Sequence, residues 1–77
     1  MAEIIELKAG EVTPNGDSFS FIQAIPYSNF RATPVKVNGE DLPSEPMEIS
    51  LKANEELTGE WENIRMIYGR ILLTKSN

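Results

Sequence analysis

Carboxylates are the only abundant side chains in this chain whose type and clustering could do chemistry. A calcium ion takes several oxygen ligands, and a pair of carboxyl groups can act as the acid and nucleophile of a glycoside hydrolase. The calcium-loop pattern of alternating ligands leading to Gly and a later Glu is absent, and 77 residues offer little cleft to desolvate a carboxylate pair. We therefore expect solvated strand faces rather than metal or catalytic sites. The two acidic clusters are Glu40, Asp41, Glu45, Glu48 and Glu55, Glu56, Glu60, Glu62.

The residue types that are missing exclude most other chemistry. The chain contains no histidine and no cysteine, so it cannot form a disulfide framework, a thiolate nucleophile, a zinc finger or a Ser-His-Asp triad. A small jelly-roll enzyme of the cupin kind lacks the histidines that its metal site normally uses. Gly10, Gly16 and Gly39 are too dispersed to form a phosphate-binding loop. We expect no enzymatic activity and no cofactor.

Charge and length restrict the partners. Seven basic residues against twelve acidic residues leave a net charge of −5, which argues against nucleic-acid binding. No stretch resembles a signal peptide or a membrane-spanning segment, and we expect a soluble protein without membrane contact. A chain of this mass buries only about 60% of its unfolded surface. Without disulfides or a metal, association with another chain is the expected source of additional stability.

Alternation of apolar and polar residues predicts β-strands. The clearest example runs from Met47 through Ile49 and Leu51 to Ala53, and weaker runs occupy residues 5–9, 18–25, 35–37 and 64–73. The only helical window, residues 52–63, contains Gly59 and has no apolar stripe. We expect one all-β domain spanning residues 1–77, built as a small antiparallel sandwich or barrel of short strands with a jelly-roll-like arrangement.

Glycine, proline and asparagine separate these runs. Residues 13–17 are expected to form a tight turn joining the first two strands, and Asn38-Gly39 has the same turn chemistry. Thr58-Gly59 is expected to separate the Met47 strand from Trp61. Gly69 lies inside an apolar run and is expected to be a bulge or a close backbone approach rather than the end of a strand.

Aromatic and aliphatic side chains supply the expected core and contact sites. Phe19 and Phe21 are expected to fill the core. Tyr27 and Phe30 lie outside any clear strand and suggest a contact site or a packed loop, while Trp61 could cap the core or anchor an interface. Arg65, Arg70 and Lys75 could meet an acidic partner, but we expect them to balance charge in an acidic chain.

The segment 64–73 carries apolar residues on both faces, which is typical of a strand that is covered on both sides. One side could face the core and the other a neighbouring subunit. The residues expected to be buried against neighbours are Ile67, Ile71, Leu72 and Leu73. An acidic substitution at Leu72 or Leu73 is accordingly expected to dissociate an oligomer.

Residues 57–73 carry a further pattern: Gly59, an aromatic at Trp61, Ile64, a β run, and then Gly69 followed by Ile71 in a last apolar strand. This pattern resembles the ending of small virion-associated proteins of tailed bacteriophages. The resemblance implies a capsid or tail accessory protein, located in the virion and soluble in the host cytoplasm before assembly. It would bind other virion proteins and perform no chemistry.

Two functions therefore remain open. The first is a non-enzymatic phage structural protein that acts as a homo-oligomer, a trimer, in capsid decoration, as cement or at a fibre base. The second is a monomeric β-domain that binds carbohydrate or protein through an exposed platform of Tyr27, Phe30 and Trp61. A solvent-accessible tryptophan in a stable monomer would favour the second.

Overall fold

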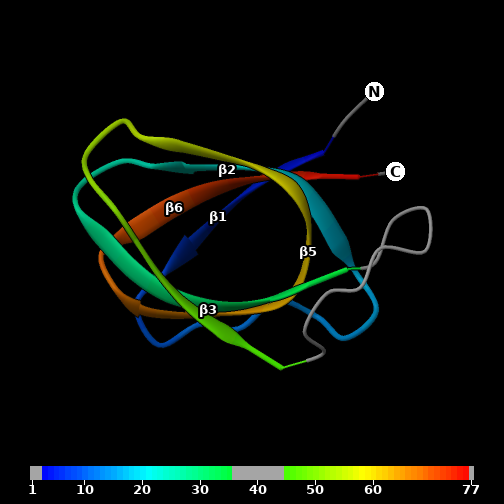
Figure 1. The fold of residues 1–77 in the computed structure, drawn as a ribbon. Helices are drawn as coiled ribbons and strands as arrows, with labels where there is room; N and C mark the ends of the chain where they lie inside the picture. The colour runs from blue at the N-terminus through cyan, green and yellow to red at the C-terminus, as the bar shows by residue number, and fades with distance from the viewer. Residues whose placement is uncertain (1–2, 36–44, 77) are drawn as a thin grey trace.

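The computed structural model describes residues 3–35 and 45–76, which form six β-strands of one antiparallel sheet (Figure 1). The expected strand at 35–37, the Asn38-Gly39 turn, and the carboxylates Glu40 and Asp41 lie partly or wholly outside these residues. The strands are β1 (Ile4–Lys8), β2 (Ser18–Ala24), β3 (Ser28–Pro34), β4 (Met47–Leu51), β5 (Glu56–Tyr68) and β6 (Arg70–Lys75).

The strand order is β1-β6-β2-β5-β3-β4, so β1 and β4 form the two edges. The expected all-β, antiparallel fold is confirmed, but the pairing of the strands describes a single open sheet, and neither a sandwich nor a closed barrel follows from it. The turn at residues 13–17 is present, with Gly16 at a φ of 91°. It does not join a hairpin, because β6 lies between β1 and β2.

Strand β5 organises the sheet, because it is 13 residues long and pairs with different neighbours along its length. Its first half pairs with β2, from Gln23↔Glu56 to Ser18↔Glu62, and its second half pairs with β3, from Pro34↔Trp61 to Asn29↔Tyr68. Between the two halves Asn63 adopts a φ of 51°, where a register irregularity interrupts the β3 ladder. Asparagine tolerates this left-handed conformation better than most residues. A left-handed residue at such an irregularity changes the direction of the strand, and Figure 1 shows that β5 curves strongly along its length.

The hydrophobic core lies on the concave face of this curled sheet and receives side chains from every strand. A bulge in β2 between Phe19 and Phe21 changes which residues face inward, so Phe19 and Ile22 are both buried. Phe21 is consequently only partly buried and lies outside the core cluster, which makes the expectation for Phe21 wrong. The buried apolar residues are Leu7, Phe19, Ile22, Ala24, Phe30, Ala32, Leu51, Ile64, Met66, Ile71 and Leu73.

Three boundaries differ from the sequence-based expectation. Gly59 lies inside β5 and does not separate two elements. Strand β3 was not expected, because its sequence SNFRATP has too few apolar residues to show a clear alternation. Gly69 ends a strand rather than forming a bulge, since it is the single residue between β5 and β6. The expected close backbone approach is confirmed, because a Cβ on Gly69 would lie 2.5 Å from the Tyr27 carbonyl oxygen.

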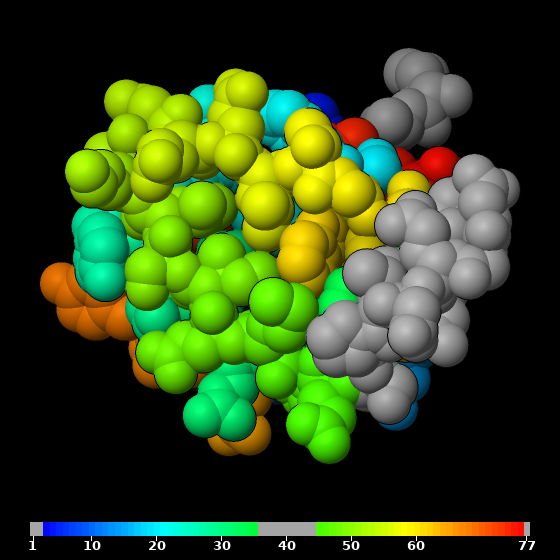
Figure 2. All heavy atoms as spheres, viewed as in Figure 1, coloured from blue at the N-terminus to red at the C-terminus, as the bar shows by residue number. Residues whose placement is uncertain are grey.

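The described residues contain no helix, which agrees with the absence of an apolar helical stripe. Accordingly, the described part of the chain has no helix long and apolar enough to cross a membrane. In Figure 2, residues of β4 and β5, coloured from yellow-green to yellow, cover much of the visible face.

Candidate functional site

The tightest feature of the fold is the turn at Gly69, where the chain leaves β5 beside β3 and enters β6 beside β1 and β2. Gly69 has a φ of 91°, a conformation that L side chains rarely adopt. A Cβ placed on this residue would lie 2.5 Å from Ser28 Oγ and 2.5 Å from the Tyr27 carbonyl oxygen. Only glycine fits this position without displacing the backbone of the β2–β3 turn.

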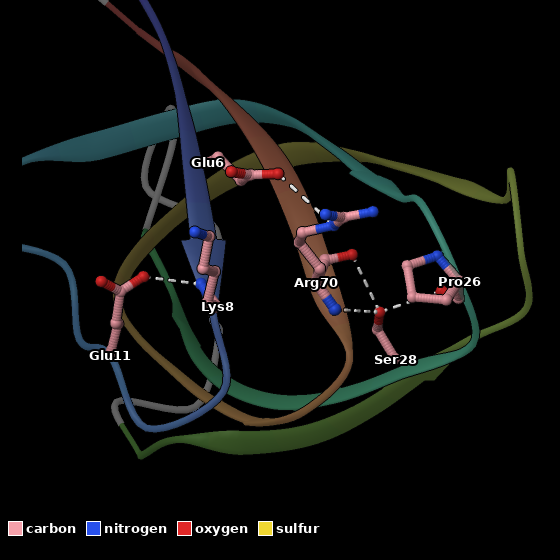
Figure 3. A network of polar contacts seen from close by, with 6 residues as sticks. All are labelled: Glu6, Lys8, Glu11, Pro26, Ser28 and Arg70. Atoms are coloured by element: carbon pink, nitrogen blue, oxygen red, sulfur yellow. Dashed lines mark hydrogen bonds and ion pairs between the residues drawn. The ribbon is translucent and has the colours of Figure 1, made fainter.

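Ser28 fastens the two turns together from its fully buried position at the start of β3 (Figure 3). Its Oγ accepts the Arg70 N–H at 3.1 Å and lies 3.0 Å from the carbonyl oxygens of both Arg70 and Pro26, to one of which its single hydroxyl hydrogen can donate. The buried hydroxyl is thus satisfied, and it satisfies backbone groups of two separate turns. The Arg70 side chain lies outside and pairs with Glu6, with Nε and Oε2 3.4 Å apart.

Exposed apolar side chains gather over this fastened turn. Tyr27 and Tyr68 are 51% and 63% exposed, and their rings are tilted with centroids 6.3 Å apart. Ile67, which precedes Tyr68 at the end of β5, is 48% exposed. We call Tyr27, Ile67 and Tyr68 the tyrosine corner. A rigid backbone beneath exposed aromatic and aliphatic groups is an arrangement suited to contact with another molecule, because little conformational entropy is lost on binding.

The structure separates the residues that the sequence grouped as an interface. Ile67 and Tyr27 are exposed, as contact residues must be. Phe30, Ile71 and Leu73 are fully buried in the core of this chain, so they are not available to a neighbour. The reason is the sheet's curl, which gives β3 and β6 an inward face that a short apolar run does not reveal. Leu72 points to the other face of β6 and is half-buried.

Trp61 is half-buried and packs against the core. Its indole N–H donates to the Thr58 carbonyl oxygen at 3.1 Å, across the residue Gly59, whose φ of 114° permits this approach. Phe30 is buried, so Tyr27, Phe30 and Trp61 do not form a shared exposed platform. Tyr68, which the sequence-based reasoning assigned only to a strand, is the aromatic that accompanies Tyr27.

A surface hollow of about 370 Å³ adjoins the tyrosine corner through Ile67. It is lined by Arg31 and Arg65, which are direct cross-strand partners on β3 and β5, together with Gly10, Met66 and Ile67. Arg31 carried no sequence signal, because its strand was not recognised. The pairing of Arg31 with Arg65 becomes visible only when the register of β3 and β5 is known.

The described carboxylates mostly perform local structural tasks. Glu11 Oε1 accepts the Lys8 backbone N–H at 2.7 Å, and Glu55 Oε1 accepts the Lys52 N–H at 2.6 Å. Glu60 Oε2 accepts the Ser76 hydroxyl at 2.6 Å. Among residues 3–35 and 45–76, no three acidic side chains are grouped so that they could hold a metal ion. Every fully buried side-chain nitrogen or oxygen in those ranges has a hydrogen-bond partner.

The arrangement can therefore offer an apolar corner and an adjacent basic hollow to a partner. Comparison of the chain with known protein families, with curated proteins and with solved structures finds no match.

Proposed function

We propose that this chain is a non-enzymatic structural protein of a bacteriophage virion that assembles as a homo-oligomer, a trimer, through the tyrosine corner. The observation that carries the self-association is the exposure of Tyr27, Ile67 and Tyr68 at one place on a protein of this size. Tyrosine and large aliphatic residues are enriched at the centres of interfaces, where their burial supplies most of the binding energy.

The location of this corner supports a role in assembly. The tyrosine corner lies directly over the Gly69 turn, whose backbone is held by the buried Ser28 hydroxyl. A contact surface on a fixed turn keeps its geometry when copies associate, which a closed symmetric ring requires. Burial of apolar area at about 25 cal/mol per Å² would drive the association.

The phage assignment rests on the pattern of Gly59, Trp61, Ile64, Gly69 and Ile71. Gly59 allows the Trp61 indole to approach the backbone, and Gly69 allows the chain to turn sharply between two strands. The glycines of this pattern therefore have structural roles here. In the virion the protein would decorate or cement the capsid, or contribute to a fibre base.

We also infer that the curled sheet closes into a small barrel. Residues 10–13 continue from β1 and run beside the second half of β5, where Val12 bridges Arg65. The Gly10 and Thr13 N–H groups donate to the Met66 and Ile64 carbonyl oxygens, both at 3.0 Å. This contact links the β1 end of the sheet back to β5, and it supports closure on that side.

The assembly is tested by substituting Ile67→Asp and Tyr68→Asp, which place a charge on the exposed corner and leave the core untouched. Ile4→Asp is the matched control, because Ile4 is 64% exposed but lies at the far end of β1 from the Gly69 turn. We expect the corner variants to become folded monomers and the control to remain assembled. Equal assembly of all three variants would contradict the proposal. Co-sedimentation of the wild-type protein with phage particles tests the virion assignment separately.

A further inference from the structure

We propose that Arg31 and Arg65 form a binding site for an oxyanion, a phosphate or carboxylate group, in the hollow beside residues 10–13. This inference does not depend on the proposed function. It rests on the register of two strands, the lining of the hollow and the ion pairs among the described residues.

The first observation is that Arg31 and Arg65 are directly opposite each other on neighbouring strands. Side chains in such pairs emerge on the same face with their Cβ atoms about 4.5–5.5 Å apart, and like charges there repel. Both arginines are exposed, and both line the same hollow. Two of the three arginines of an acidic protein are thus placed where they destabilise each other.

The second observation concerns the acidic residues nearby. Glu48 is the cross-strand partner of Arg31 on β4 and accepts a hydrogen bond from Asn29 Nδ2 at 3.3 Å, and it forms no ion pair shorter than 4.0 Å with Arg31. Glu11, next to Val12, accepts the Lys8 backbone N–H. Within residues 3–35 and 45–76, ion pairs shorter than 4.0 Å involve Arg70 and Lys75, and neither Arg31 nor Arg65 takes part in one.

These two features together favour an anionic ligand. A guanidinium presents a planar fork of N–H donors that matches the oxygens of carboxylate and phosphate, so two adjacent forks can hold one such group. A bound oxyanion would also remove the repulsion between Arg31 and Arg65. The exposed Ile67 supplies an apolar side chain to the same hollow, which lowers the local dielectric and strengthens the contact.

The ligand group could come from a free ion or from a carboxylate of a second copy of this chain. The test uses ¹⁵N-labelled protein and follows the Nε–Hε signals of its three arginines. Arg70 serves as the internal control, because it already pairs with Glu6. Inorganic phosphate is titrated at constant ionic strength, with chloride as the replaced ion.

For a free ion, we expect the Arg31 and Arg65 signals to shift together and saturate with phosphate while the Arg70 signal stays in place. For a carboxylate from a second copy, the same two signals shift with protein concentration in phosphate-free buffer of low ionic strength. In the Arg31→Gln and Arg65→Gln variants, the phosphate concentration that half-saturates the shift of the remaining arginine signal should rise about tenfold or more. The Lys variants, which keep the charge without the fork, should recover only part of the affinity.

The proposal is overturned if the two signals respond neither to phosphate nor to protein concentration. It is also overturned if Arg70 shifts equally, which would indicate general screening of charge, or if the Gln variants respond like the wild type. The spectra of the variants report whether each remains folded. Substitution of exposed arginines leaves the core intact, so loss of the response cannot be attributed to unfolding.

Discussion

Ser28 and Gly69 occupy positions that depend on each other: a Cβ on Gly69 would lie only 2.5 Å from the Ser28 Oγ. The serine hydroxyl fills the space that the glycine leaves and accepts the N–H of the next residue, Arg70. The connection between β5 and β6 is a single residue long because of this fit. The surface proposed for assembly lies directly above it.

Gly69→Ala should destabilise the protein strongly for two reasons. The new Cβ would clash with the Tyr27 backbone and with Ser28, and the alanine would have to adopt a positive φ. We expect a loss of about 2–4 kcal/mol in the free energy of unfolding, measured by urea denaturation. Gly16→Ala is the control, since Gly16 has the same φ of 91° but nothing within 4 Å of its Cβ position. It should cost only about 1–2 kcal/mol. Similar losses for both variants would mean that the close approach contributes nothing.

Ser28→Ala removes the hydroxyl and leaves the partly buried Arg70 N–H without its acceptor. The expected loss in the free energy of unfolding is about 1–3 kcal/mol. The Ser50→Ala substitution on β4 is the control, because it removes only an exposed hydroxyl, which accepts the Asn29 Nδ2 hydrogen bond at 2.8 Å, and it should change stability by less than about 0.5 kcal/mol. A Ser28→Ala protein as stable as the wild type would show that the two turns hold without this fastening.

Thr13→Val tests the contact between residues 10–13 and β5. The Thr13 side chain is buried and its Oγ1 accepts the Ile64 N–H at 3.0 Å, which valine cannot do. We expect a loss of about 1–3 kcal/mol and faster hydrogen exchange at the Ile64 amide. Unchanged exchange at Ile64 would mean that the Thr13 hydroxyl contributes nothing to the contact between residues 10–13 and β5. Thr58→Val, at an exposed position in β5, is the matched control.

Arg65→Gln should stabilise the protein at low ionic strength, because it removes the repulsion from Arg31. The expected gain is about 0.2–1 kcal/mol, and it should shrink as salt screens the charges. Arg70→Gln is the contrasting variant: it breaks the exposed pair with Glu6 and should cost about 0–1 kcal/mol. Destabilisation by Arg65→Gln in phosphate-free buffer would mean that a favourable contact of Arg65 outweighs the repulsion.

Leu73→Asp should prevent folding and therefore cannot serve as a test of assembly. Leu73 is fully buried, and a buried unpaired carboxylate costs more than the total stability of about 4–12 kcal/mol expected for this length. Circular dichroism should show loss of β-structure in this variant, while Ile67→Asp should retain it. A folded Leu73→Asp protein would mean that Leu73 lies at a surface, where it could contact a neighbouring subunit, as expected from the sequence.

The strands with strict alternation were predictable from the sequence, and the surface was predictable only in part. Strand β4 was predictable because its apolar residues alternate strictly with polar ones, so that one face of this edge strand is polar throughout. Phe21 was misplaced because a bulge reverses the alternation within β2, and no residue type in the run marks the bulge. Ile71 and Leu73 were assigned to an interface because sequence alone does not show that β6 is an interior strand with neighbours on both sides.

Two exposed features depended on pairing between distant segments. Tyr27 and Tyr68 meet only because the β2–β3 turn lies beside the end of β5, and Arg31 meets Arg65 only through the β3–β5 register. Local patterns carry no information about such pairs. Tyr27 and Ile67 were nevertheless named in advance, because an aromatic outside a clear strand and an apolar residue on a second strand face both indicate exposed contact sites.

Sedimentation equilibrium of the wild-type protein over a wide concentration range tests the proposed assembly most directly. We expect a closed oligomer, a trimer, whose mass does not change over that range, and folded monomers for Ile67→Asp and Tyr68→Asp. A folded wild-type monomer at every concentration would contradict self-assembly through the tyrosine corner.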